Sequence, residues 1–195
     1  MYILRKFDEK IYNKHGKILG IDEVGRGAGF GPLVVCGIIL ENFNFSKEIK
    51  DSKALNRKKR EELCELILNN AEYCKIEFSS NKEVDKKGLS RCLGKSIDNI
   101  IAGQDKAGKI LLDGNVNFSS TYLVECVVRG DSKSFTIACA SIVAKVTRDN
   151  YIYKIADKYN NYDLNKNLGY PTPRHKELVK EYGLSDKHRE TWNWQ

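Results

Sequence analysis

The stretch Gly20-Ile21-Asp22-Glu23-Val24-Gly25-Arg26-Gly27 decides how the rest of this sequence can be interpreted. It places two adjacent carboxylates at the end of an apolar run and follows them with an arginine between two glycines. Adjacent carboxylates repel each other, so a folded chain keeps them together mainly where a cation neutralises them. The Gly-Arg-Gly turn offers bare backbone and one fixed positive charge. The stretch therefore predicts a site for a hard metal ion beside a phosphate backbone.

Length and composition are those of a globular chain. The 195 residues are enough for one domain, and 41% hydrophobic and 30% charged residues are ordinary values. The longest apolar run, residues 31–40, is too short to span a membrane, and residues 1–8 have no signal-peptide layout. We therefore expect a single domain over residues 1–195, a cytoplasmic location and no membrane partner. The net charge of +7 fits either a lysine-rich solvated surface or attraction to nucleic acid.

The cysteines give no sign of a zinc site or of a disulfide framework. Six cysteines occur at positions 36, 64, 74, 92, 126 and 139, and no two are spaced as Cys-x-x-Cys. The three histidines, His15, His175 and His188, form no cluster with them in the sequence. Zinc ligands and disulfide scaffolds usually show such spacings, so we interpret most of the thiols as small buried hydrophobes.

Hydrophobic periodicity predicts an α/β order of elements. We expect strands over residues 17–21, 33–40, 73–78, 110–113 and 122–128, and helices over residues 57–69, 90–102, 135–159 and 174–182. Asn56 is expected to cap the first helix, while Pro173 starts and Gly183 ends the last. Strands come first and then alternate with helices, which predicts a sheet with an antiparallel and a parallel portion.

Four acidic residues fall at or near the ends of three expected strands: Asp22, Glu23, Asp113 and Asp131. Singly, each can be explained as a turn residue or a solvated side chain. Together they favour a divalent-metal site, because oxygen ligands suit magnesium or manganese and sites form at the carboxyl ends of strands. On a regular strand Asp22 and Glu23 would point to opposite faces. We therefore expect the first strand to end at Glu23, so that the turn re-aims its side chain.

Other motifs leave alternatives open. Asp149, inside the long expected helix, competes with Asp131 as the fourth ligand, and we prefer Asp131 because it follows a strand. A Gly-x-Gly-x-x-Gly pattern fails, since Phe30 or Pro32 stands where the third glycine is needed. Residues 103–110 resemble a phosphate-binding loop, but Ile110 replaces the required Ser or Thr and the segment precedes a strand. A nucleotide-hydrolysing enzyme is therefore disfavoured.

Two polar segments admit a structural or a binding interpretation. Asp51-Ser52-Lys53 precedes a helix and is either a capping turn or a phosphate site. Tyr170 follows Gly169 in a polar loop and is either a core aromatic or a stacking platform for a sugar or base. We interpret His175, close by, as a structural residue.

Taken together, these segments resemble the ribonuclease HII family over almost the whole chain. The motifs that carry the resemblance are residues 20–27 with Gly31-Pro32-Leu33, residues 51–53, 112–115, 130–132 and 140–149, and residues 169–172 with His175. The related ribonuclease HIII type has Thr in place of Arg26, Glu in place of Asp131 and an extra N-terminal domain, so it fits less well.

The resemblance implies a fold and a reaction. The implied fold is ribonuclease H-like, a mixed five-stranded sheet flanked by helices with a small helical C-terminal part from about residue 160. The implied reaction is endonucleolytic cleavage of RNA in RNA–DNA hybrids, and cutting 5′ to a single ribonucleotide embedded in duplex DNA, with 3′-hydroxyl and 5′-phosphate products. It implies two ions of Mg²⁺ or Mn²⁺, held by Asp22, Glu23, Asp113 and Asp131.

The resemblance also implies substrate contacts. The backbone of Gly25-Arg26-Gly27 would approach the 2′-hydroxyl, Tyr170 would stack on the next sugar, and Ser52 and Lys53 would bind phosphates. The expected partners are RNA–DNA hybrids and ribonucleotide-containing duplexes. Residues 191–195 show no clear clamp-binding motif, and we expect a monomer. The alternative is a non-catalytic nucleic-acid-binding module, against which the intact set of four acids speaks.

Overall fold

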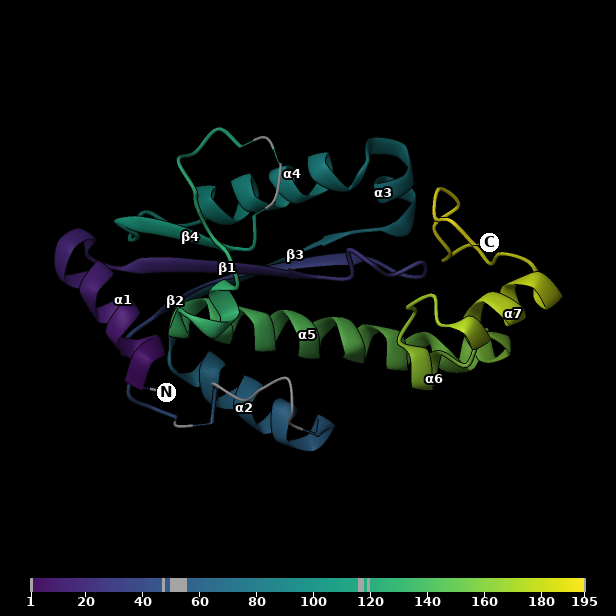
Figure 1. Ribbon diagram of the computed structural model, residues 1–195, viewed down its shortest axis with the longest axis horizontal. Coiled ribbons are helices and arrows are strands. Elements are labelled where there is room, and N and C mark those ends of the chain that lie inside the picture. Colours follow the sequence, from purple (N-terminus) through teal and green to yellow (C-terminus); the bar gives the residue numbers. More distant parts are fainter. Residues whose placement is uncertain (1, 47, 50–55, 116–117, 119, 195) are drawn as a thin grey trace.

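The centre of the structure is one mixed sheet of five strands (Figure 1). A computed structural model describes residues 2–46, 48–49, 56–115, 118 and 120–194. The strands are β1 Ile18–Val24, β2 Leu33–Leu40, β3 Ala71–Ser79, β4 Lys109–Asp113 and β5 Glu125–Val127, in the order β3-β2-β1-β4-β5. β2 pairs antiparallel with both β1 and β3, whereas β4 pairs parallel with β1 and β5. The predicted sheet with an antiparallel and a parallel portion is confirmed.

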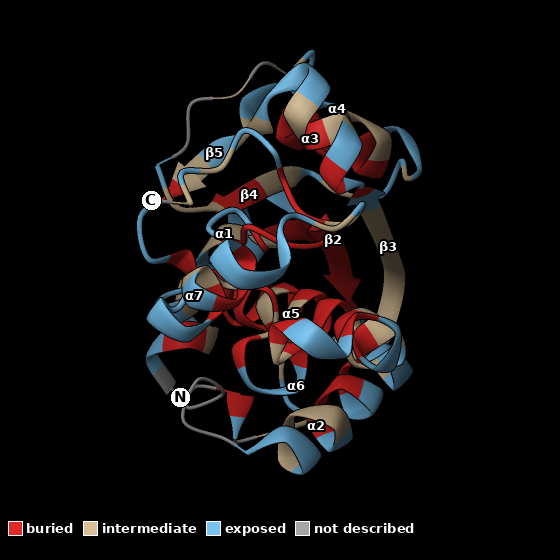
Figure 2. Ribbon diagram, turned by 90° about the vertical axis from the view of Figure 1, so that its right-hand side faces the viewer, coloured by how far each residue is buried: buried red, intermediate tan, exposed pale blue. Residues whose placement is uncertain are grey.

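Helices cover both faces of this sheet. One face carries α3 Asn81–Lys87 and α4 Leu89–Ala102; the other carries α1 Tyr2–His15, α2 Arg57–Asn69 and α5 Phe135–Ala156. Figure 1 shows α5 running along β1, and Figure 2 shows that buried residues concentrate on the sheet and on α5. None of the described helices combines the length and the hydropathy that a membrane span requires.

Most predicted elements are present, with shifted ends. The bounds of β2 and α2 match, and the Asn56 side chain caps α2 by accepting a hydrogen bond from the Lys59 amide at 2.9 Å. The long helix α5 ends at Ala156 instead of residue 159, where a 3₁₀ helix, Asp157–Tyr162, takes over. β5 has only three residues, because it pairs with β4 only from Glu125 to Val127.

The helix α1 was not predicted, and it anchors the start of α5. Its apolar face is sparse, with Leu4 buried and Phe7 and Ile11 half-buried. The Asp8 carboxylate is fully buried on the same face and accepts hydrogen bonds from the Thr136 amide at 2.7 Å and the Thr136 hydroxyl at 2.6 Å. Because the first amides of a helix lack partners within it, this carboxylate satisfies one of them and fixes α1 to α5.

The C-terminal part is helical, as expected, and packs around Phe30 at the far end of α5 (Figure 1). It contains the 3₁₀ helix, the short helix α6 Leu164–Asn167, and α7 Pro173–Tyr182. Gly183 ends α7 with a φ of 76°, as predicted. The following tail returns to the connection between β1 and β2, where His188 forms an isolated β-bridge with Phe30.

Two fully buried histidines hold this tail in place. The Ser185 amide donates to Nδ1 of His188 at 2.9 Å, so the proton of His188 lies on Nε2 and faces Nε2 of His175 at 3.2 Å. His175 then donates from Nδ1 to the Tyr170 carbonyl at 2.9 Å. Both rings are therefore neutral. Burial lowers the pKa of both, and lowers that of His188 to about 4. The interpretation of His175 as a structural residue is confirmed.

We expect the fold to lose stability in mild acid through His188. The unfolded chain takes up a proton near the ordinary histidine pKa of 6.5, while the folded chain resists until about 4. Stability from this group is thus complete above pH 6.5 and falls by roughly 3 kcal/mol as the pH approaches 4. Urea unfolding at about pH 7.5 and 4.5 measures this loss. The His188→Gln variant, with no proton to gain, controls for other groups; equal pH dependence of the two proteins would contradict the prediction.

Candidate active site

The four predicted acids line one cavity of about 330 Å³. They come from β1, from the end of β4 and from the turn before α5. The cavity also contains residues that the sequence did not single out as site residues. Its lining comprises Asp22, Glu23, Val24, Arg60, Asp113, Asp131, Ser141, Ile142 and Lys145.

Asp22 is the most buried of the four acids, with 6% of its surface exposed. It lies within β1, opposite Cys36 of β2. Its Oδ1 accepts a hydrogen bond from the Glu23 amide at 2.7 Å, and the Ser141 hydroxyl also bonds to the carboxylate. Burial raises the pKa of Asp22 well above 3.8, and the negative charges of Glu23 and Asp113 raise it further. Asp22 thus carries a buried charge with too little compensation.

Glu23 corrects one prediction. β1 does not end there but continues to Val24, because the antiparallel pairing with β2 persists through Glu23–Val35 and Val24–Val34. Glu23 nevertheless lines the same cavity as Asp22. The parallel pairing of β1 with β4 stops at Ile21, so beyond it the flank of β1 on that side is open. Side chains from both faces of β1 can reach this opening.

The Glu23 carboxylate is only partly neutralised. Nη1 of Arg26 donates to its Oε1 at 3.2 Å. Its Oε2 is buried and has no hydrogen-bond partner in the described part of the chain. Burial raises the pKa of Glu23, although Arg26 lowers it. The glycine-flanked arginine thus pairs with the second acid of the opening stretch and leaves one buried oxygen of that acid without a hydrogen bond.

Asp113 fixes the turn that carries Asp131. Oδ1 of Asp113, the last residue of β4, accepts hydrogen bonds from the amides of Gly130 and Asp131. These residues form a 3₁₀ turn, Gly130–Ser132, after Arg129 adopts the left-handed conformation with a φ of 54°. Asp131 therefore lies in an anchored turn between β5 and α5, and not at a strand end as predicted.

Asp149, the competing candidate, does not line the cavity. It forms an ion pair with Lys145 at 2.9 Å on α5. Lys145 itself lines the cavity, as does Ser141 one helical turn before it. Their spacing of four places both on one helix face, and this was the signal that could have identified them. Arg60, from the charged start of α2, is the other cation of the cavity and carried no such signal.

The Gly-Arg-Gly loop uses its two glycines differently. Gly25 has a φ of 93°, and a Cβ there would lie 2.5 Å from Nε of Arg148 and 2.6 Å from the Pro32 carbonyl oxygen. Only glycine fits such a position. Gly27 is exposed, and a Cβ there would meet nothing within 4 Å. The fold therefore demands glycine at position 25 but gives no reason for it at position 27.

Two buried arginines brace this loop through its carbonyl groups. Arg148 of α5 donates to the carbonyls of Pro32 at 3.1 Å and Phe30 at 3.0 Å. Arg189 of the C-terminal tail donates to the carbonyls of Arg26 at 3.2 Å and Gly31 at 3.1 Å. Burial lowers the pKa of both guanidinium groups, and lowers that of Arg189 to about 10. Sequence reasoning missed this brace, because its partners are backbone groups far away in the chain.

Tyr170 lies between the loop and the cavity. Its half-buried ring packs under the Arg148 guanidinium at 5.2 Å and is 5.7 Å from Nζ of Lys145. The preceding carbonyl, that of Gly169, accepts hydrogen bonds from the amides of Gly29 and Phe30. The structure thus places Tyr170 near Arg148, which braces the loop, and near Lys145 of the cavity lining. Ser52 and Lys53, the predicted phosphate ligands, lie outside the described residues.

Comparison with known proteins identifies the family. A family model for ribonuclease HII matches residues 19–194. The chain belongs to the ribonuclease HII family. The ribonuclease HII of Aliarcobacter butzleri is 42% identical over 176 residues, which cover 90% of this chain and 90% of that protein.

Solved structures share the ribonuclease H-like fold. The ribonuclease H2 of Pyrococcus horikoshii OT3 is 28% identical, with a TM-score of 0.77 over 91% of this chain and 94% of that chain. Bst-RNase HIII, solved in complex with Mn²⁺, is 17% identical, with a TM-score of 0.73 over 91% of this chain and 67% of that chain. The second likeness concerns the fold alone. Like other ribonucleases HII, the chain is a ribonuclease H, a hydrolase.

The donor set of this cavity suits a hard divalent cation. All four acids provide carboxylate oxygens as possible ligands. Oε2 of Glu23 is a buried acceptor without a hydrogen bond in the described part of the chain, so a cation could bind it. Burial is the main cause of the raised pKa values of Asp22 and Glu23, and the neighbouring negative charges add to it. Within the described residues, however, no three such side chains are arranged to enclose an ion as they stand. Ligation by these acids would require their side chains, which already line the cavity, to rotate toward one another.

We expect Asp22→Asn to stabilise the metal-free protein near neutral pH. Because the pKa of Asp22 is raised in the folded state, ionisation above the ordinary value of 3.8 costs folding free energy. A neutral amide removes that cost and should raise the free energy of unfolding by about 1–3 kcal/mol. Urea unfolding with a chelator measures the gain. The gain should vanish below pH 3.8, where the carboxyl is protonated in both states, and a destabilised variant at neutral pH would contradict it.

Proposed function

We propose that this chain is an endonuclease that cleaves the RNA strand of RNA–DNA hybrids and cuts 5′ to single ribonucleotides embedded in duplex DNA. The observation that carries the proposal is that Asp22, Glu23, Asp113 and Asp131 line one cavity beside the Gly-Arg-Gly loop. Membership of the ribonuclease HII family supports the same reaction class. The products would carry 3′-hydroxyl and 5′-phosphate ends.

The four acids would hold two ions of Mg²⁺ or Mn²⁺. When bound, such ions activate water and stabilise the leaving oxygen of a phosphodiester. Asp113 would have a double role, because the oxygen that anchors the Asp131 turn leaves its other oxygen available for ligation. Burial, together with the neighbouring negative charges, raises the pKa of Asp22 and Glu23, and bound cations would compensate the buried carboxylates. Ion binding and the geometry of the acids would therefore support each other.

The cations at the cavity would position the substrate. Lys145 lies on α5 and Arg60 lies on α2, and both line the cavity. A phosphodiester entering between them would meet positive charge on the way to the acids. Lys145 is already held by Asp149, so its ammonium group is fixed in place before substrate arrives.

The Gly-Arg-Gly loop would recognise the ribose. A 2′-hydroxyl both donates and accepts hydrogen bonds, so exposed backbone amides and carbonyls can distinguish RNA from DNA. Gly27 fits this role because its backbone is exposed and no side chain shields it. Arg189 holds the carbonyl of Arg26 from the buried side, so the peptide groups of the loop are oriented in advance.

Tyr170 would stack on the sugar of the following nucleotide, where a 2′-hydroxyl would obstruct it. The Arg148 guanidinium packs on its ring, and its carbonyl accepts a hydrogen bond from Nδ1 of His175. Such a rigid aromatic surface suits stacking. The phosphate contacts of Ser52 and Lys53, the cytoplasmic location, the monomeric state and the single-domain organisation remain predictions.

The decisive assay uses a DNA duplex with one ribonucleotide, incubated with the protein and Mg²⁺ or Mn²⁺. We expect one cut 5′ to the ribonucleotide, and we expect Asp113→Asn to slow it by about a thousandfold or more, because a neutral amide replaces a carboxylate ligand. The amide oxygen can still accept from the amides of Gly130 and Asp131, so the variant tests ligation and not the anchoring of the turn. Calorimetric titration with Mn²⁺ shows whether the variant has lost ion binding.

Each other outcome of this assay has a definite meaning. Tight binding without any cut would replace the nuclease with the non-catalytic nucleic-acid-binding module. A cut that Asp113→Asn leaves unchanged would refute the role of the acids. Hydrolysis of ATP in the same buffer would indicate the nucleotide-hydrolysing alternative instead.

A pair of glycine variants tests the ribose sensor. Gly27→Ala should leave the thermal midpoint nearly unchanged, because its Cβ meets no protein atom, yet reduce cleavage by about tenfold or more, because the methyl group meets the ribose. Gly25→Ala should lower the thermal midpoint markedly, because its Cβ collides with Arg148 and Pro32. Calorimetry and the cleavage assay measure both. Full cleavage by a stable Gly27→Ala protein would remove this loop residue from the recognition of the 2′-hydroxyl.

A further inference from the structure

Three thiols gather in the layer between the sheet and α2. Cys36 of β2 and Cys64 of α2 are buried, whereas Cys74 of β3 is half-buried. The Sγ atoms of Cys36 and Cys74 are 4.0 Å apart. All six cysteines of the chain are free thiols, and the cleavage mechanism uses none of them.

The sheet register explains why these two sulfurs meet. Cys36 pairs with Ile76, and Cys74 pairs with Ile38, so the two cysteines are diagonal neighbours on the same face of the β2–β3 pair. A disulfide has its sulfurs about 2.05 Å apart, so bond formation requires the side chains to rotate and the strands to shift slightly. β3 can supply the shift, because it is an edge strand whose register with β2 is already irregular at Ile39–Leu40.

Cys74 and Cys36 differ in burial and in the direction in which their pKa values are shifted. Cys74 is half-buried, and the hydrogen bond with Cys36 lowers its pKa, which favours the nucleophilic thiolate. The same hydrogen bond, together with burial, raises the pKa of Cys36 well above its ordinary value, and burial raises the pKa of Cys64 to about 11. Oxidation should therefore start at Cys74, with Cys36 as the nearest thiol to complete it.

We propose that Cys36 and Cys74 form a reversible dithiol–disulfide pair that a hydroperoxide oxidises. Sγ of Cys74 attacks one peroxide oxygen and displaces hydroxide, which leaves a sulfenic acid. Sγ of Cys36 then attacks the Cys74 sulfur, the S–S bond forms, and the hydroxyl group leaves. The two thiol protons end on the two leaving oxygens, so two thiols and one hydrogen peroxide give one disulfide and two waters. The peroxide is reduced and the two sulfurs are oxidised.

The cross-link would act one strand away from the acid cavity. Cys36 is the register partner of Asp22 in the β1–β2 pair, so any displacement of Cys36 is passed to the backbone of that acid. Oxidation should therefore slow cleavage, and a dithiol reductant should restore it. This second part rests on the proposed nuclease function, whereas disulfide formation can be measured without any nuclease assay.

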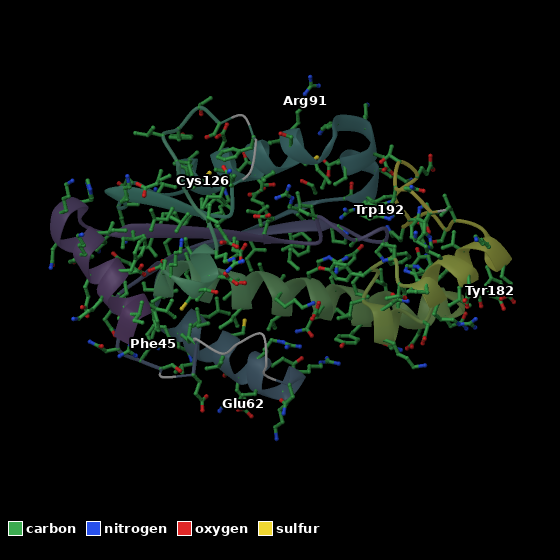
Figure 3. The ribbon with its side chains drawn as sticks, viewed as in Figure 1. Phe45, Glu62, Arg91, Cys126, Tyr182 and Trp192 are labelled. Carbon is green, nitrogen blue, oxygen red and sulfur yellow. The ribbon has the colours of Figure 1, made fainter. Side chains whose placement is uncertain are left out.

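The chain offers a matched control. Cys126 of β5 is half-buried like Cys74, but it packs in the α4-side cluster, on the opposite face of the sheet (Figure 3). In the test, the whole protein, the Cys74→Ser variant and the Cys126→Ser variant are treated with hydrogen peroxide under native conditions. The remaining thiols are then blocked, and peptides are mapped by mass spectrometry without reduction.

We expect a Cys36–Cys74 cross-linked peptide in the native protein and in Cys126→Ser, and none in Cys74→Ser. Cleavage should fall severalfold in the first two proteins, recover with dithiothreitol, and persist in peroxide-treated Cys74→Ser. A Cys74 that stops at sulfinic acid, or that links to Cys64, would overturn the pair. A cross-link that forms without slowing cleavage would overturn its coupling to Asp22.

Discussion

The main constraint on this structure is a group of carboxylates that lie close together beyond the point where the pairing of β1 with β4 stops. Asp22, Glu23 and Asp113 meet there, and the described contacts of their carboxylates are with Arg26, a serine hydroxyl and backbone amides. Burial of charge without a full partner is costly, so the metal-free protein is under electrostatic strain at this point. The rest of the molecule is arranged around it: α5 and α2 bring one cation each to the cavity, and the β4 acid orders the turn that brings the fourth carboxylate.

Periodicity and capping signals predicted most of the fold, because they depend on neighbours within one element. β2 is a continuous apolar run, α4 has a clean buried face, and Asn56 and Gly183 mark helix ends through local hydrogen bonds and backbone conformation. The ends of β1 and β5 were predicted less well, since pairing with another strand decides them. α1 was missed because its face is narrow and a buried carboxylate, Asp8, occupies part of it.

The same distinction applies to the site. The four acids were found because their residue type is informative even before their geometry is known. Arg148 and Arg189 could not be found as a pair, because they contact carbonyl groups, which every residue has. The sequence also could not show that the Asp131 amide donates a hydrogen bond to Asp113, since the two residues are distant in the chain.

The β-bridge between Phe30 and His188 joins a segment that is synthesised early to one that is synthesised late. The acids and the sheet come from residues 18–131, whereas the Arg26 carbonyl of the Gly-Arg-Gly loop accepts from Arg189, and the Gly29 carbonyl accepts from the Arg189 amide. Residues 185–189 are synthesised after all four acids, so until they emerge the loop lacks the hydrogen bonds from Arg189. On the proposed function, an incomplete chain would hold the acids without this support of the loop that recognises the ribose, and selectivity would mature last.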